Sequence, residues 1–378
     1  MQDILLKRFR DWSGKHPIMM YRAPGRLNII GEHTDYNHGK CLPAAIAQSV
    51  YLALAPAYET QVFSLNQENS WYPGQPNKQP DWAIYFQGVM DYLKSKGYSW
   101  PAFKLMFGGD LAPGSGLSSS SAITCGFISI LDEFSSWNIS SHDLTKFAVQ
   151  SEKASGLDGG MMDQISILHG KKNHALFIDC QLWTFQYIPA LIPGYQWLIA
   201  DTGVRHRLVD SEYNSRSGAC KQILEKLKLT FPLLPSLSAL TVTEQDQAMR
   251  HLSPEERNLA SYVWDENRRV GEMVDALSNG NVKRVGDLLL QGHNGLRLKY
   301  RVSCQELDFL VGYAKQSDIA VGARMMGGGF GGCTLHLIPE SETFPYQIGM
   351  SNSFKNRFGY NIHSFPAFVE DGVHRIDG

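Results

Sequence analysis

The sequence lacks the features by which several classes of protein are recognised. Its 378 residues carry a formal net charge of only −2 and no basic tract, so the charge does not favour nucleic acid. No apolar run approaches the length that would span a membrane. The six cysteines include no Cys-x-x-Cys pair, and the twelve histidines show no ligand spacing with them. We therefore expect no nucleic-acid partner, no membrane partner, no zinc site and no disulfide framework.

We also expect that the N-terminus is not a secretory signal. Ile4, Leu5 and Leu6 are followed at once by charged residues, without the apolar core or cleavage site of a signal peptide. We interpret residues 1–15 as a short amphipathic helix. Scattered cysteines in a chain of this length are typical of reduced, mostly buried thiols, which predicts a cytoplasmic protein. The composition, 43% hydrophobic and 19% charged, is that of a globular chain long enough for two domains.

Residues 112–122, Ala-Pro-Gly-Ser-Gly-Leu-Ser-Ser-Ser-Ser-Ala, combine two glycines with four consecutive hydroxyl side chains. Apolar residues at helical spacing follow, so we expect a helix to begin at the serines. A helix N-terminus attracts phosphate, and hydroxyls there can ligate magnesium. No Gly-Lys-Ser/Thr ends the loop, and alone it is equally consistent with a linker before a capped helix. The candidate nucleotide-binding residues are Pro113, Gly114, Ser115, Gly116, Leu117, Ser118, Ser119 and Ser120.

Residues 31–39, Gly-Glu-His-Thr-Asp-Tyr-Asn-His-Gly, form a polar cluster after an extended segment, 18–30, that is broken at Pro24-Gly25. Glu32 and Asp35 can accept hydrogen bonds from sugar hydroxyls, and the imidazole and amide of the cluster can both donate and accept. A solvated turn is the alternative, because polar loops are common. The functional interpretation is that residues 31–39 present a row of polar side chains, a hydroxyl-binding comb, to the hydroxyl groups of a sugar.

Two further stretches are rich in glycine. Residues 155–164 hold three glycines and two aspartates, which is consistent with a helix C-cap or with an aspartate held close to a ligand. Residues 327–332 match the G-x-G-x-x-G pattern of dinucleotide-binding folds, but that pattern counts only where it opens a helix. An alternating segment, 333–338, follows here and predicts a strand. We expect a flat turn that packs against a phosphate loop.

The remaining pattern predicts a chain of mixed helices and strands without repeats. A surface loop is expected at 65–81. Helices are expected at 82–93, 141–154, 211–228, 254–290 and 304–315, and strands at 50–64, 101–107, 174–179 and 197–200.

Three separated stretches together resemble one family. Residues 23–43 resemble the galactokinase signature, residues 112–122 the phosphate loop of the GHMP small-molecule kinases, and residues 324–333 the third, glycine-rich motif of that family. The resemblance runs from about residue 20 to about residue 338. It implies a two-lobed α+β fold with the active site in the cleft between lobes, which we divide at 1–195 and 196–378. It also implies phosphorylation of the anomeric hydroxyl of galactose with ATP and Mg²⁺, and we expect a monomer.

The resemblance assigns roles to single residues. Arg26 and Asp163 fall at the positions of the family's catalytic arginine and aspartate. Asp158 is a rival, because 155–158 resembles the segment that carries the aspartate in mevalonate-type members. The ungapped match over 160–180 favours Asp163. The implied sugar contacts are Glu32, His33, Asp35, Gly160 and Tyr213, the implied magnesium ligand is Ser120, and the tryptophan implied near adenine is Trp82.

The physical chemistry supports the two catalytic roles. Phosphoryl transfer is catalysed mainly by positioning and by stabilisation of charge. A cation such as Arg26 offsets charge on the transferred group and keeps a neighbouring carboxylate ionised. An ionised Asp163 can accept the proton of the attacking hydroxyl, or it can only orient that hydroxyl.

Some positions depart from the family pattern. Ser151 stands where galactokinases usually have a magnesium-binding glutamate, and Glu152 lies one residue nearer the catalytic aspartate, as in other GHMP kinases. Glu152 is therefore a second candidate ligand for magnesium. Leu298 and Lys299 replace acidic residues, and Met326 stands where threonine is common.

Three alternatives stay open. The chain could phosphorylate a related sugar, N-acetylgalactosamine or arabinose. It could be a galactokinase-like sugar sensor without turnover, against which the intact serine loop, Arg26 and Asp163 argue. It could be a nicotinamide-dependent oxidoreductase that uses residues 327–332, which would need a helix after that turn.

Overall fold

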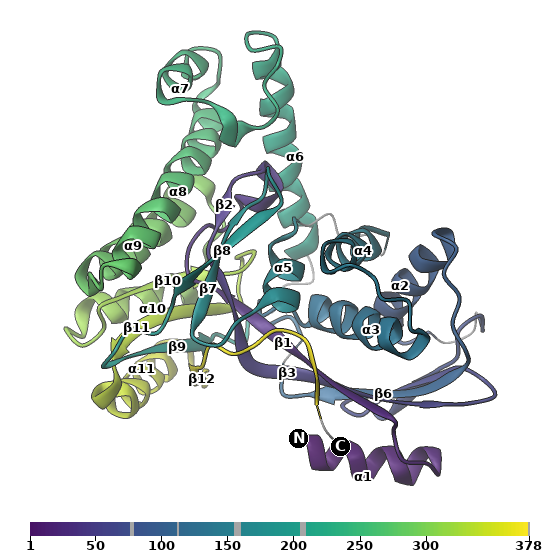
Figure 1. Cartoon of the computed structure of the whole chain (residues 1–378). Coiled ribbons are helices and arrows are strands. Elements are labelled where there is room, and N and C mark those ends of the chain that lie inside the picture. Colours follow the sequence, from purple (N-terminus) through teal and green to yellow (C-terminus); the bar gives the residue numbers. More distant parts are fainter. Residues whose placement is uncertain (76–78, 112, 155–159, 205–208, 377–378) are drawn as a thin grey trace.

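The computed structural model describes residues 1–75, 79–111, 113–154, 160–204 and 209–376. Much of the N-terminal half forms a six-stranded sheet with the order β13-β1-β3-β6-β4-β5 (Figure 1). β4 runs parallel to β6, and the other neighbours pair antiparallel. The strands are β1 (Met19–Asn28), β3 (Pro43–Pro56), β4 (Gln61–Ser64), β5 (Asn69–Trp71), β6 (Phe103–Gly109) and β13 (His374–Ile376).

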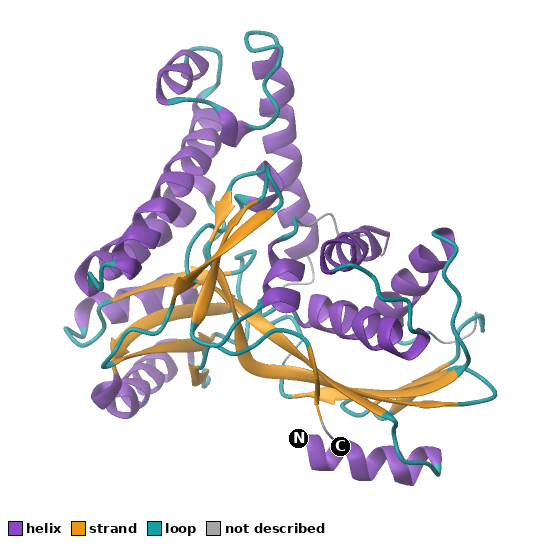
Figure 2. Ribbon diagram, in the orientation of Figure 1, coloured by secondary structure: helices purple, strands orange, loops and turns teal. Residues whose placement is uncertain are grey.

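Helices cover both faces of this sheet (Figure 2). On one face, α3 buries Ile123, Phe127 and Leu131 against the strands, at the helical spacing that predicted them. On the other face, α1 buries Leu5 and Phe9, which confirms the amphipathic helix at the N-terminus. The helices are α1 (Gln2–Ser13), α2 (Ala83–Ser95), α3 (Ser119–Ser135), α4 (Ser141–Ala154) and α5 (Met162–His169).

The C-terminal half is built on a four-stranded antiparallel sheet with the order β10-β11-β9-β12. Its strands are β9 (Tyr195–Asp201), β10 (Gly322–Met326), β11 (Cys333–Pro339) and β12 (His363–Ala367). Its helices are α6 (Val209–Lys228), α7 (Val242–Met249), α8 (Pro254–Ser278), α9 (Val282–Gly295), α10 (Gln305–Gln316) and α11 (Thr343–Phe358). Figure 1 shows α6 and α8 projecting away from the sheets, with α7 near their far end.

Short elements join the two halves. A three-stranded sheet consists of β2 (Lys40–Cys41), β7 (His174–Asp179) and β8 (Thr184–Pro189). Two short helical turns complete this region. η1 (Asp35–Asn37) lies between β1 and β2, and the π-helical η3 (Leu296–Tyr300) directly follows α9. Both carry residues that face the site described below.

The structure confirms the α+β class and most predicted elements. The predicted helix at 254–290 is two helices, because the chain turns at Gly280, whose φ of +63° is left-handed. The predicted surface loop at 65–81 contains the strand β5. Residues 333–338 form a strand, so the glycine pattern at 327–332 does not open a helix. Five of the six cysteines are buried, as expected.

The division at residues 195 and 196 stays a prediction, and the C-terminal strand β13 adds to the sheet of the N-terminal half. Across the part of the chain that the structure describes, no helix has both the length and the apolar character needed to cross a membrane.

Candidate active site

A cavity of about 350 Å³ lies where the two halves meet, and its size is typical of a pocket for a small ligand. It is bounded by β1, the loop before α3, the start of α5 and the glycine-rich turn between β10 and β11. The lining residues are Arg26, Gly114, Gly116, Ser118, Ser119, Ser120, Asp163, Val204, Met326, Gly327, Gly328, Gly329, Gly331 and Gly332.

A β-bulge directs Arg26 toward this cavity. The register of β1 against β3 shifts between Pro24 and Arg26, at the break that the sequence predicts. Gly25 allows the close approach, since a Cβ there would lie 2.8 Å from the Leu117 carbonyl oxygen. The Arg26 backbone N–H donates to the same carbonyl at 3.1 Å, so strand and loop are joined at this point.

Arg26 and Asp163 form a bidentate ion pair. Arg26 Nε donates to Asp163 Oδ1 at 2.7 Å, and Nη2 donates to Oδ2 at 3.1 Å. Nη1 donates to the Gly116 carbonyl at 2.6 Å, and Ser118 Oγ donates to Asp163 Oδ2. Burial acts to lower the pKa of Arg26, but the charges of Asp163 and Glu32 outweigh it and raise that pKa. Asp163 lies in the first turn of α5, where the helix dipole favours an anion.

The loop before α3 presents its hydroxyls to the cavity. Ser118, with a left-handed φ of 61°, precedes α3, and Ser119 and Ser120 lie in the first turn, whose N–H groups have no partner within the helix. Ser115 and Leu117 are buried and anchor the loop instead. The Ser115 carbonyl accepts from Cys333 Sγ at 2.9 Å. The loop is thereby fixed to both halves of the molecule.

The glycine-rich turn packs directly on this loop. A Cβ at Gly327, whose φ is +80°, would lie 3.3 Å from Gly116 Cα. Met326 Sδ accepts the Asn28 backbone N–H at 3.3 Å, so this departure from the family pattern has a structural role. The expected packing of the turn against the loop at residues 112–122 is confirmed, and the binding of phosphate by that loop stays a prediction.

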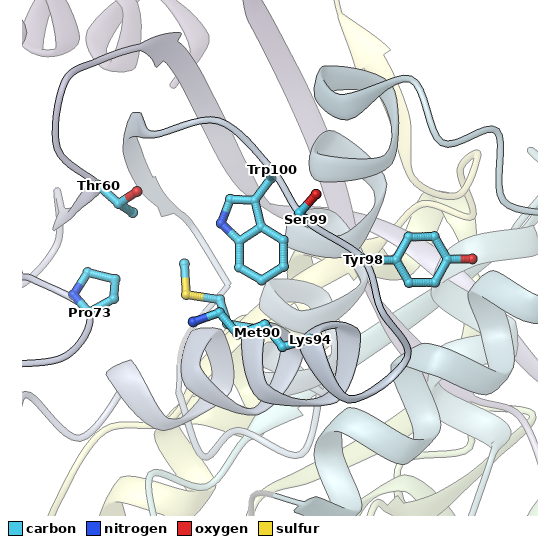
Figure 3. A pocket seen from close by; sticks show the side chains of 7 residues that line it. All are labelled: Thr60, Pro73, Met90, Lys94, Tyr98, Ser99 and Trp100. Atoms are coloured by element: carbon cyan, nitrogen blue, oxygen red, sulfur yellow. The ribbon is translucent and has the colours of Figure 1, made fainter.

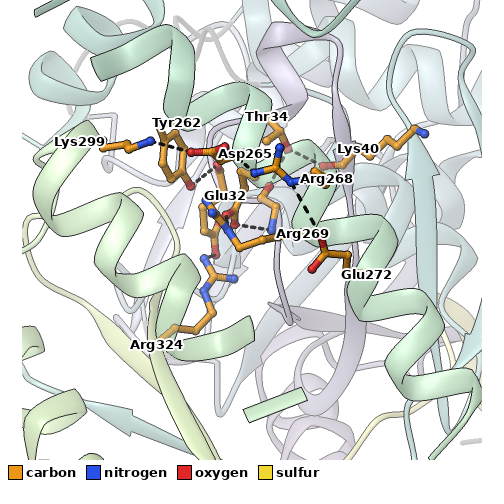
Figure 4. A network of polar contacts seen from close by, with 12 residues as sticks. Glu32, Thr34, Lys40, Tyr262, Asp265, Arg268, Arg269, Glu272, Lys299 and Arg324 are labelled. Atoms are coloured by element: carbon orange, nitrogen blue, oxygen red, sulfur yellow. Dashed lines mark hydrogen bonds and ion pairs between the residues drawn. The ribbon is translucent and has the colours of Figure 1, made fainter. Parts of the chain in front are cut away.

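Glu32 is held by residues of the C-terminal half (Figure 4). Its Oε1 accepts the Gly327 backbone N–H at 2.9 Å and lies 3.4 Å from Arg324 Nη2. Its backbone carbonyl accepts the Tyr262 hydroxyl at 2.9 Å. Glu32 is only 2% exposed and Arg324 is fully buried. A buried carboxylate needs such a partner, because an isolated charge is costly to remove from water.

A buried ion pair on α8 fixes the start of the same loop. Glu266 Oε1 accepts the Gly31 backbone N–H at 2.9 Å, and Glu266 Oε2 accepts from Arg269 Nε at 2.7 Å. Figure 4 shows Arg269 and Glu32 as parts of one network of polar contacts. The loop that carries Glu32, His33 and Asp35 is therefore held by an ion pair from the other half of the chain.

The five predicted sugar-contact residues lie together. A Cβ at Gly160 would lie 2.0 Å from Asp35 Oδ2, so only glycine fits beside that carboxylate. The rings of His33 and Tyr213 lie 5.4 Å apart. Burial, and then the charge of Asp163, raise the pKa of Asp35 to about 7. The polar comb is thus buried, next to Asp163 and the cavity.

Known sequences match this chain along most of its length. The galactokinase galactose-binding signature matches residues 7–56, the GHMP kinases N terminal domain residues 85–171, and the GHMP kinases C terminal domain residues 273–343. A galactokinase of Thermotoga maritima is 34% identical to this chain over 95% of it and 100% of that protein. The chain belongs to the galactokinase family of the GHMP kinases.

Another galactokinase and two solved structures are also similar to this chain. A galactokinase of Clostridium beijerinckii is 33% identical over 99% of each chain. The structure of Lactococcus lactis galactokinase complexed with galactose is 27% identical and superposes with a TM-score of 0.93 over 99% of this chain and 100% of that one. A mevalonate kinase of Methanococcus jannaschii, at 16% identity and a TM-score of 0.69 over 93% and 98%, shares the fold.

Four residues that the galactokinase resemblance assigns to the nucleotide do not line the cavity, namely Trp82, Pro113 and the buried Ser115 and Leu117. Trp82 is 5% exposed, packs among Trp71, Phe86 and Phe107, and donates from Nε1 to Asn69 Oδ1 at 2.9 Å. Its role near adenine stays a prediction. Pro113 is exposed near the start of the loop. The rival aspartate Asp158 lies outside the described residues.

Glu152 is buried behind the serine loop. Its Oε2 accepts from Gln164 Nε2 at 2.7 Å, and its Oε1 has no hydrogen-bond partner among the residues described. Burial raises the pKa of Glu152 to about 7. Within the same described ranges, no three His, Cys, Asp or Glu side chains form a cluster that could hold a metal ion. A cation here would need phosphate oxygens among its ligands.

A second cavity, of about 360 Å³, lies at the far end of α2 (Figure 3). Met90, Trp100 and Pro73 face it, and Lys94 supplies the one charged group among its described lining residues. It contains none of the residues that the galactokinase signature predicts. We therefore place the active site in the first cavity.

Residue-by-residue reasoning missed Arg324, Tyr262 and the pair Glu266 and Arg269. A signal existed for the first, because Arg324 stands in a short apolar strand next to the glycine turn, and a buried arginine requires an anion. No pattern in the sequence connects it to Glu32, which lies almost three hundred residues earlier.

Proposed function

We propose that this chain transfers the γ-phosphoryl group of ATP to the anomeric hydroxyl of galactose and releases galactose 1-phosphate and ADP. The Arg26–Asp163 pair carries the proposal. It lies between a loop suited to phosphate and a buried comb suited to hydroxyls. Similarity to galactokinases over the whole chain supports the same reaction.

Asp163 is proposed to bind the anomeric hydroxyl and to take its proton as the oxygen attacks. Arg26 keeps that carboxylate ionised and places positive charge beside the transferred group. Ser118, which donates to Asp163 Oδ2, fixes the carboxylate from the nucleotide side. Turning of the carboxylate is thereby limited before either substrate arrives.

The N-terminus of α3 is proposed to hold the phosphates of ATP. Ser120 and Glu152 are the proposed ligands of Mg²⁺, because hydroxyl and carboxylate oxygens suit a hard cation and Glu152 Oε1 is buried without a partner among the described residues. Bound magnesium would neutralise charge on the phosphates. The monomeric state and the cytoplasmic location expected from the sequence stay predictions.

The proposal is tested by incubating the protein with ATP, Mg²⁺ and galactose. We expect ADP to form only when galactose is present, and ³¹P NMR to identify a phosphate on the anomeric carbon. A sugar sensor would bind galactose in calorimetry without forming ADP. That outcome would refute the proposed reaction.

Gly116→Val is expected to weaken ATP binding about tenfold or more, the scale of losing one hydrogen bond to a charged group. Gly116 has a φ of +78°, which a β-branched residue rarely adopts, so the loop must rearrange. Galactose binding should persist. Calorimetry with each ligand measures both affinities.

Gly194→Val is the matched control, because Gly194 has a φ of +80° and lies in open surroundings between β8 and β9. It carries similar backbone strain far from the cavity. If Gly116→Val binds ATP as tightly as Gly194→Val does, the phosphate-loop assignment is wrong.

Arg324→Met is expected to lower the free energy of unfolding by about 3 kcal/mol, because removing one partner of a buried ion pair leaves an uncompensated charge. Urea denaturation measures the change. Adding Glu32→Gln removes the orphaned charge, so the double variant should be more stable than Arg324→Met alone. A double variant as unstable as the single one would mean that Arg324 contributes by packing and not by charge.

A further inference from the structure

A chain of hydrogen bonds runs from the sugar comb into the C-terminal half. His33 Nδ1 lies 2.9 Å from the Tyr36 hydroxyl, and the Tyr36 hydroxyl lies 2.8 Å from that of Tyr300. The Tyr300 hydroxyl lies 3.2 Å from Cys220 Sγ on α6. His33 and Cys220 are almost completely buried, and Tyr300 is fully buried. Both ends of the chain are therefore shielded from solvent, whereas Tyr36 between them is half-buried.

The surroundings of His33 leave one ring nitrogen for a ligand. Its ring lies within 6 Å of three tyrosine rings, those of Tyr36, Tyr213 and Tyr300. Nε2 is buried and has no hydrogen-bond partner among the described residues. His33 also has a left-handed φ of 61°, a conformation that is costly for this residue and that is found at functional sites. Glu32 and Asp35 lie in the same loop.

The direction of the chain follows from the strength of its end groups. A thiol is a weak donor and a weak acceptor, whereas an imidazole nitrogen is a good acceptor. If every proton points toward His33, the thiol of Cys220 donates to Tyr300, Tyr300 donates to Tyr36, and Tyr36 donates to His33 Nδ1. Each tyrosine hydroxyl then donates to nitrogen or oxygen and not to sulfur. The opposite direction would make Tyr300 donate to sulfur.

We propose that Tyr36 and Tyr300 are positioning residues that hold His33 as the tautomer with its proton on Nε2, so that His33 donates to a sugar hydroxyl. This inference rests on the proposed function. It assigns which of the sugar-binding side chains donate hydrogen bonds and which accept them. Glu32 and Asp35 accept hydrogen bonds from sugar hydroxyls, and His33 supplies the donor between them. A sugar hydroxyl can accept from His33 and donate to a neighbouring carboxylate at once.

Burial of the ring agrees with a neutral imidazole. It lowers the pKa of His33 to about 3, although the Gly328 backbone acts in the opposite direction. A neutral ring has one donor and one acceptor, so its partner at Nδ1 decides what Nε2 offers.

The turn that carries Tyr300 is secured by Arg297 and by Lys299, one of the departures noted in the sequence. Tyr300 ends the π-helical turn η3, a geometry that often marks functional positions. Lys299 Nζ lies 2.6 Å from Asp265 Oδ2 on α8, and Arg297 Nε lies 2.9 Å from Asp308 Oδ2 on α10. Lys299, where an acidic residue is usual, therefore pins the turn and with it the end of the chain.

Tyr36→Phe removes one oxygen and should raise the KM for galactose about tenfold, the cost of leaving a buried hydrogen-bonding group unpaired. The kcat and the KM for ATP should stay unchanged. Tyr300→Phe should act in the same direction with a smaller effect, because it lies one bond further from His33.

Tyr346→Phe is the matched control. The Tyr346 hydroxyl lies 2.9 Å from His336 Nδ1 in a separate buried cluster, so the same kind of bond is removed away from the site. It should leave the KM for galactose unchanged. If Tyr36→Phe alters that KM no more than Tyr346→Phe does, the inference is overturned.

A double-variant cycle separates positioning from general loosening of the site. If Tyr36 acts through His33, then Tyr36→Phe should have no further effect on the KM in a His33→Gln background. Additive effects would overturn the inference, because they would mean that the hydroxyl acts independently of the ring.

A spectroscopic measurement tests the tautomer without any sugar. The ¹⁵N chemical shifts of the His33 ring, assigned by comparison with His33→Gln, should report a proton on Nε2, and Tyr36→Phe should give a mixture of tautomers. A proton found on Nδ1 would overturn the inference. If galactose is not phosphorylated, the proposed function fails, but the tautomer can still be read from these shifts.

Discussion

The Asp163→Asn variant should phosphorylate galactose about 100-fold more slowly or worse, which is the scale of losing a general base. An amide has almost the shape of the carboxylate but cannot take the proton of the attacking hydroxyl. It also leaves Arg26, which donates to both carboxylate oxygens, without its anion. We expect the fold and ATP affinity to be largely retained. Steady-state kinetics and calorimetry with ATP measure the two quantities.

Asp143→Asn is the matched control for this variant. Asp143 lies in the first turn of α4, as Asp163 does in α5, so both stabilise a helix N-terminus. Asp143 is half-buried and has no ion pair among the described residues, so its replacement should leave turnover unchanged. Asp158→Asn should also matter much less than Asp163→Asn. A larger loss at Asp158 would reverse the assignment of the catalytic aspartate.

Discrimination between galactose and its C4 epimer should be the largest difference measured. A site built to pair a hydroxyl rejects a sugar that lacks it there, and the ratio of kcat/KM can reach roughly 10⁴. Glu32 and Asp35 are 2% and 7% exposed, so water cannot replace a misplaced hydroxyl. Glucose leaves one of these partners unpaired and places its own hydroxyl elsewhere. It should therefore be a poor substrate.

The comparison should include N-acetylgalactosamine and arabinose as well as galactose and glucose. Met326 lines the cavity where a threonine is common, whereas the departures at Leu298 and Lys299 do not line it. We expect galactose to have the highest kcat/KM of the four. If any other sugar ranks above it, the substrate assignment is wrong, whereas the kinase assignment stands.

The sequence was most informative where a function occupies one continuous stretch. The serine loop and the residue 31–39 cluster have unusual local compositions, so their positions could be predicted. The break at Pro24-Gly25 was also visible, and the structure explains it as the bulge that directs Arg26. The choice of Asp163 over Asp158 came from the family resemblance, because both aspartates lie in the same glycine-rich stretch, 155–164.

Contacts between distant segments were beyond sequence reasoning. The partners of Glu32 come from α8, β10 and the glycine turn, more than two hundred residues away, and only packing brings them together. Short elements were missed for a different reason. α5 has eight residues after a glycine-rich junction, and β12 has five, too few for a periodic pattern to stand out.

The strand β13 has a consequence for how molecules meet one another. It covers the outer edge of β1 with only three residues, paired to Met20, Tyr21 and Arg22. Arg375 in β13 pairs with Glu133 on α3, which ties the strand to the helical face. An open edge of a long strand is a template for pairing with another chain, and a short charged edge strand blocks it. β13 thus protects the sheet that carries Arg26 against aggregation by edge-to-edge strand pairing.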